Sequence, residues 1–158
     1  PALRRGQADA ELVAVVDRLL GVADDGPRIA ALDVLRQVGP TAEADRSGAV
    51  TALLADRSAP VRAAALRAAA AFPSVLKDDG ARTAVVEALG DDDPEARVAA
   101  IRLALDVRGV ATDRALRRAL EDESPAHRAA LLAAIQSSKA YAADLRLVGV
   151  VAGALTDD

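Results

Sequence analysis

The sequence has no cysteine, methionine or tryptophan, and it has only one phenylalanine, one tyrosine and one histidine among 158 residues. The absence of cysteine excludes disulfides, thiolate zinc sites and cysteine nucleophiles, and it favours a cytoplasmic location. A single-core domain of this length normally buries several large aromatic side chains. A core of Ala, Leu and Val suits closely spaced helices instead, because small side chains let two helix axes approach.

Long apolar runs are also missing. The most apolar segment, Leu145–Leu155, is shorter than the roughly 18 residues that a membrane-spanning helix needs, and it contains Arg146. We therefore expect no membrane partner. The N-terminus shows no signal-peptide pattern, and the chain begins at Pro1 rather than at methionine, so we expect a fragment of a larger protein.

The chain also lacks a surplus of positive charge. The chain has 20 Lys and Arg against 24 Asp and Glu, which gives a formal net charge of −4. Binding to a phosphate backbone depends mostly on cations, and binding to single strands depends also on aromatic platforms for base stacking. We therefore expect no nucleic-acid partner.

The sequence does contain a clear internal repeat. Four arginines mark it, at separations of 34, 35 and 31 residues: Arg28, Arg62, Arg97 and Arg128. Twelve positions before each arginine stands an apolar residue: Val16, Val50, Val85 and Leu116. Four positions after each stands another: Leu32, Leu66, Ile101 and Leu132. A repeat of about 30–40 residues is typical of a solenoid, whose units bury their apolar faces against their neighbours.

Each repeat is predicted to form two helices joined by a tight turn. In the second repeat, Val50 and Leu54 have the spacing of a helical apolar face. After the turn, Ser58 is the expected N-cap, and Pro60 lies where the first turn of a helix tolerates a missing N–H. This second helix should continue to about Phe72, because the next residue is proline.

The same pattern divides the whole chain. The expected repeats cover residues 9–39, 46–73, 80–109 and 112–138, and a partial fifth repeat covers 141–158. The linkers between them are short, and none resembles an interdomain hinge. We therefore expect residues 1–158 to form one all-α domain of about four helical hairpins plus part of a fifth.

The turn and second helix share a specific pattern. An aspartate precedes the arginine by six positions in three repeats, and alanines with Leu or Ile follow it. The matching segments are Asp56 with Arg62–Leu66, Asp91 with Arg97–Ile101, and Asp122 with Arg128–Leu131. The first repeat departs, because Val22 stands six positions before Arg28 and the acids fall at Asp24 and Asp25. This pattern resembles the HEAT repeat, in the short bacterial form called the lyase-type HEAT-like repeat.

The resemblance implies a right-handed α-α superhelix in which turn aspartates and helix arginines form a structural ladder. These residues are Asp56, Arg62, Asp91, Arg97, Asp122 and Arg128. Residues that recur in every repeat serve the repeat, and one active site would not need several copies of them. A carboxylate near a helix N-terminus meets free N–H groups, and an arginine can bridge that carboxylate to the next repeat.

No motif for catalysis, a metal or a cofactor is present. Acidic runs such as Asp91–Asp93 lack the alternate spacing of an EF-hand loop. His127 is the only histidine, so no second histidine or cysteine can share a zinc ion with it. The glycines do not form a phosphate-binding loop. We expect no catalytic residue, no metal and no cofactor.

A candidate protein-binding surface follows from the helical register. If the second helices line the concave face, the positions one, five and nine after each arginine face outward. The charged residues at these positions are Asp33, Arg67, Arg102 and Asp106. Arg67 and Arg102 occupy the same position, so stacked repeats would place them roughly 8–10 Å apart. Such a pair favours an acidic partner, unless Asp33 or Asp106 neutralises it.

These features favour a non-enzymatic protein-binding module or scaffold. Two alternatives stay open. One is an accessory subunit or regulatory domain of an enzyme, as in lyase-type HEAT proteins, which a convergent polar pocket would mark. The other is a DNA-binding HEAT protein, which a continuous basic surface would mark. Val151 and Leu155 begin an unfinished fifth repeat, so self-association through this repeat is a further expectation.

Overall fold

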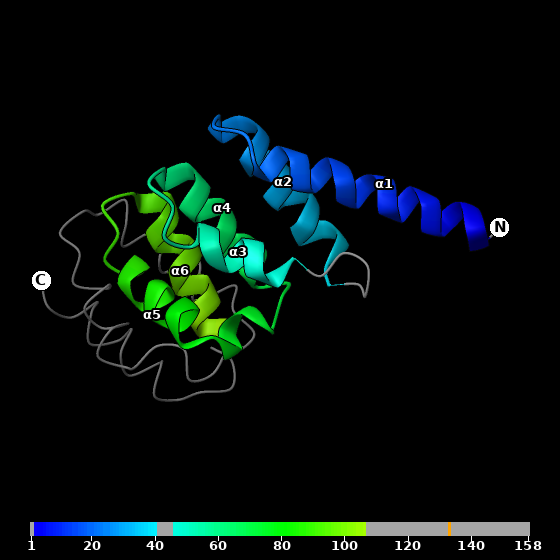
Figure 1. The fold of residues 1–158 in the computed structure, drawn as a ribbon. Coiled ribbons are helices and arrows are strands. Elements are labelled where there is room, and N and C mark those ends of the chain that lie inside the picture. Colours follow the sequence, from blue (N-terminus) through cyan, green and yellow to red (C-terminus); the bar gives the residue numbers. More distant parts are fainter. Residues whose placement is uncertain (1, 41–45, 107–132, 134–158) are drawn as a thin grey trace, which may run out of the picture. The chain divides into compact units, whose positions relative to one another are not determined.

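A computed structural model describes residues 2–40, 46–106 and 133, with the backbone alone for residues 2–9 (Figure 1). The described residues form six α-helices and one short 3-10 helix, and no strand occurs among them. The prediction of an all-α chain is confirmed for this part of the sequence. The expected fourth and fifth repeats lie outside the described residues, apart from the helical residue Ala133.

The helices follow one another in pairs along the chain. Their bounds are α1 Ala2–Leu20, α2 Asp25–Val38, α3 Ser47–Leu53, α4 Ala59–Ala69, η1 Val75–Lys77, α5 Asp79–Ala88 and α6 Pro94–Asp106. The turns predicted within the first three repeats therefore lie between α1 and α2, between α3 and α4, and between α5 and α6. Proline occupies the first turn of both α4 and α6, where its missing N–H has no helical acceptor to lose.

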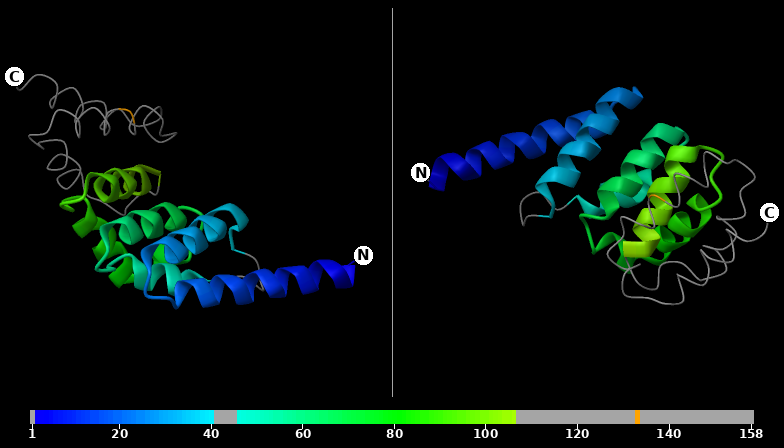
Figure 2. Two further views of the ribbon diagram at one scale, coloured as in Figure 1. Left: turned by 90° about the horizontal axis from the view of Figure 1, so that it is seen from above. Right: turned by 180° about the vertical axis from the view of Figure 1, so that it is seen from behind.

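The described residues divide into two compact units between Ala81 and Arg82. In the first unit, α2 packs against both α1 and α4, and α3 packs against α4 and η1 (Figure 2). The helix α5 begins in the first unit and continues into the second, which also contains α6. The single array over residues 1–158 stays a prediction.

The core of the described residues occupies the register that the repeat assigns to it. Around Arg28, Arg62 and Arg97, the residues twelve before and four after the arginine are all at most 3% exposed: Val16, Val50, Val85, Leu32, Leu66 and Ile101. Alanine supplies much of the remaining core, at positions such as Ala31, Ala65 and Ala100. These side chains are small enough to let neighbouring helices approach closely.

The ends of two helices have clear local causes. Gly39 follows α2 with a φ of 70°, and its N–H donates to the carbonyl of Leu35 at 2.8 Å. A positive φ favours glycine, because the Cβ of any other residue would lie too close to the adjacent backbone. The helix α4 ends at Ala69, three residues before the predicted end. Beyond Ala69 the backbone hydrogen bonds span three residues instead of four, and the N–H of Phe72 donates to the carbonyl of Ala69.

The segment 73–80, expected to be a linker, has its own structure. It contains η1, in which Val75 and Leu76 are buried. Because η1 packs against α3, this segment adds to the core of the first unit instead of only connecting two repeats.

Candidate functional site

The turn between α3 and α4 holds one of the predicted ladder residues, Asp56. One carboxylate oxygen of Asp56 accepts a hydrogen bond from the N–H of Ser58 at 2.8 Å. The other accepts a hydrogen bond from the guanidinium of Arg28 at 2.5 Å. Both charged side chains are largely buried. A single carboxylate therefore stabilises the turn between α3 and α4 and also binds α2 of the preceding helix pair. Arg28, which makes this second contact, is the fourth residue of α2.

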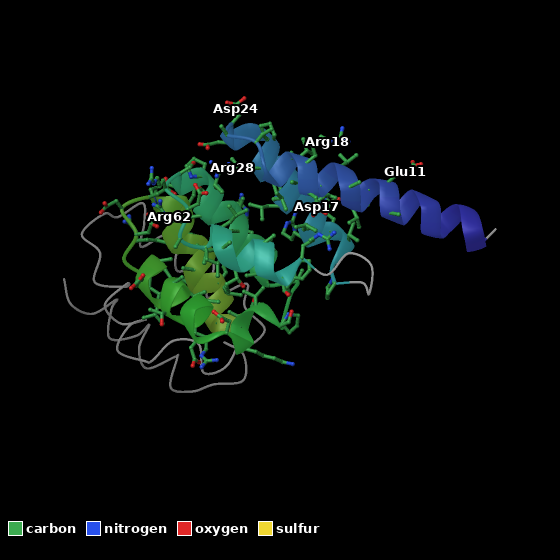
Figure 3. The ribbon with its side chains drawn as sticks, viewed as in Figure 1. Glu11, Asp17, Arg18, Asp24, Arg28 and Arg62 are labelled. Atoms are coloured by element: carbon green, nitrogen blue, oxygen red, sulfur yellow. The ribbon has the colours of Figure 1, made fainter. Side chains whose placement is uncertain are left out.

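Asp25 closes this set of contacts into a ring. Its carboxylate accepts one hydrogen bond from the hydroxyl of Ser58, at 2.5 Å, and one from Arg28, at 2.7 Å. These two hydrogen bonds lower the pKa of Asp25. The hydrogen bond to Asp25, with the charge of Asp56, raises the pKa of Arg28. We call Asp25, Arg28, Asp56 and Ser58 the α2–α4 clamp, because together they join the N-terminal ends of these two helices. Figure 3 labels Arg28, which lies near the start of α2.

Ser58 differs in part from its predicted role. It does occupy the N-cap position of α4, but its side chain makes no capping hydrogen bond. Its hydroxyl donates to Asp25 instead, so it serves the contact between helix pairs.

Two of the repeat arginines, Arg62 and Arg97, bind the backbone of the turn that precedes them. Arg62 donates to the carbonyl oxygens of Asp56 and Arg57, at 2.9 and 3.2 Å. In the second unit, Arg97 donates to the carbonyl oxygen of Asp91. The donor and acceptor are six residues apart in both cases, so two different repeats form the same contact.

The carboxylates of the turns are equivalent as well. Asp91 accepts a hydrogen bond from the N–H of Asp93 at 2.9 Å, as Asp56 does from the residue two positions later. Asp93 in turn accepts one from the N–H of Ala96 at 2.8 Å, which caps the N-terminus of α6. In the turns at Asp56 and Asp91, the repeated Asp and Arg therefore bind the same backbone groups. Asp122 and Arg128 lie outside the described residues.

The residues of the predicted concave stripe lie on three helices. Asp33, on α2, forms an ion pair with Arg36 at 3.7 Å. Arg67 is half-buried on α4, whereas Arg102 and Asp106 are exposed on α6. Arg67 and Arg102 make no ion pair with another described side chain. Because Arg67 belongs to the first unit and Arg102 to the second, their proximity stays a prediction.

One residue of the expected outward-facing set is not at the surface. Ala63, one position after Arg62, is only 2% exposed. The expectation is wrong here because α4 packs against both α2 and α3, so its buried face is wider than one apolar stripe. Seven of the 11 residues of α4 are buried.

A second contact between helices was not predicted. Arg46, which precedes α3, donates two hydrogen bonds to the carboxylate of Asp17 on α1, at 2.6 and 2.8 Å. The hydrogen bond from Arg46 lowers the pKa of Asp17. The two residues are 29 positions apart, and neither belongs to the repeated pattern. No signal in one sequence marks such a pair.

Within residues 2–40, 46–106 and 133, no three His, Cys, Asp or Glu side chains gather as metal ligands would. None of the described helices is both long enough and apolar enough to cross a membrane.

Comparison with other proteins leaves the relationship of the chain to the HEAT family a proposal. No protein-family model matches the sequence, and neither the curated proteins nor the solved structures include a match to it.

Proposed function

We propose that this chain is a non-enzymatic protein-binding scaffold built from HEAT-like repeats, which stack as an α-α superhelix. The observation that carries the proposal is the identical turn in two repeats. In both, an aspartate accepts an N–H two residues later, and an arginine donates to the carbonyl of that aspartate. Side chains used in this way hold the scaffold, so recognition falls to residues outside the repeated pattern.

The binding surface we propose contains Arg67 and Arg102. Both lie five positions after the repeat arginine, and their guanidinium groups are not used by the turns. Arginine contributes strongly to protein interfaces, because its planar group makes several hydrogen bonds to a carboxylate. An acidic segment of a protein partner fits such side chains.

The test starts with partners captured from extracts of the source cells and then purified. Isothermal titration calorimetry would compare the wild-type chain with Arg67→Glu/Arg102→Glu. We expect the double variant to bind at least about 10-fold more weakly, because two favourable contacts become repulsive. Its helicity and melting temperature should stay close to those of the wild type, since neither side chain contributes to the core.

Arg57→Glu provides a matched control. Arg57 is exposed in the turn before α4, and its reversal makes the same charge change as reversal of Arg67. This variant should bind the partner with wild-type affinity. Equal binding by all three chains would refute the assignment of this surface and leave the convex face or the loops as the better candidates.

A further inference from the structure

We draw no further inference here: the strongest candidate, the apolar face of α1 on which Leu12 and Val15 are exposed, carries no proposal because nothing in the described part of the chain shows what covers it.

Discussion

Replacing Leu32 with alanine should lower the free energy of unfolding by about 3–4 kcal/mol. Leu32 is 0% exposed on α2, which packs against both α1 and α4. The substitution removes three carbon groups, each contributing about 0.8 kcal/mol when buried, so the transfer contribution alone is about 2.4 kcal/mol.

The cavity left behind adds the rest of the loss. The buried residues of α4 are mostly alanines: Ala63, Ala64, Ala65, Ala68 and Ala69. An alanine side chain has no rotamer that could move into the space, so relaxation is limited and the loss falls in the middle of the roughly 2–5 kcal/mol range for such substitutions. A domain with a total stability of about 5–15 kcal/mol would lose a large fraction of it.

Urea denaturation followed by circular dichroism at the helix band would measure this loss. The chain lacks tryptophan, so fluorescence offers little signal. Val38→Ala on the same helix is the control: Val38 is 42% exposed, and the better helix propensity of alanine offsets part of what is lost, so we expect a change below about 1 kcal/mol. A loss below about 1 kcal/mol for Leu32→Ala, or equal losses for both variants, would refute the burial register of α2.

Two further predictions concern the charged residues of the turns. The pKa of Asp25 is lowered from 3.8, so its charged form stabilises the fold at neutral pH, and this stabilisation disappears as acid protonates the carboxylate. Asp25→Asn should therefore lower the melting temperature at neutral pH and make it fall less steeply between about pH 5 and about pH 1. The control Asp24→Asn removes no cap hydrogen bond, so it should leave the melting temperature at neutral pH nearly unchanged. An unaltered pH dependence for Asp25→Asn would contradict this role. Arg97→Met should lower the free energy of unfolding by about 1–3 kcal/mol, because the carbonyl of Asp91 loses its charged donor. Arg102→Met, an exposed change on the same helix, should cost less than about 0.5 kcal/mol, and equal melting of the two variants would show that the turn does not need Arg97.

The sequence predicts the helices and their buried faces well, because these depend on apolar spacing alone. Val50 and Leu66 are buried as the repeat predicts. The sequence does not predict that Arg62 binds carbonyl oxygens, because every residue has a carbonyl and no residue type marks the acceptor. The contact of Asp25 with Ser58 is equally hidden, since it depends on how two turns meet.

The exposed apolar face of α1 could be found only once the position of α2 was known. Leu12 and Val16 are both apolar, and they lie one helical turn apart on α1. Only the packing of α2 shows that Val16 is buried while Leu12 stays exposed.

The two oxygens of the Asp56 carboxylate make one side chain responsible for two separate features of the first unit. One oxygen binds its own turn, and the other binds Arg28 of the preceding helix pair. Because one carboxylate makes both contacts, a substitution of Asp56 alters the turn between α3 and α4 and the attachment of α2 at the same time. Neither feature can change at this position without the other.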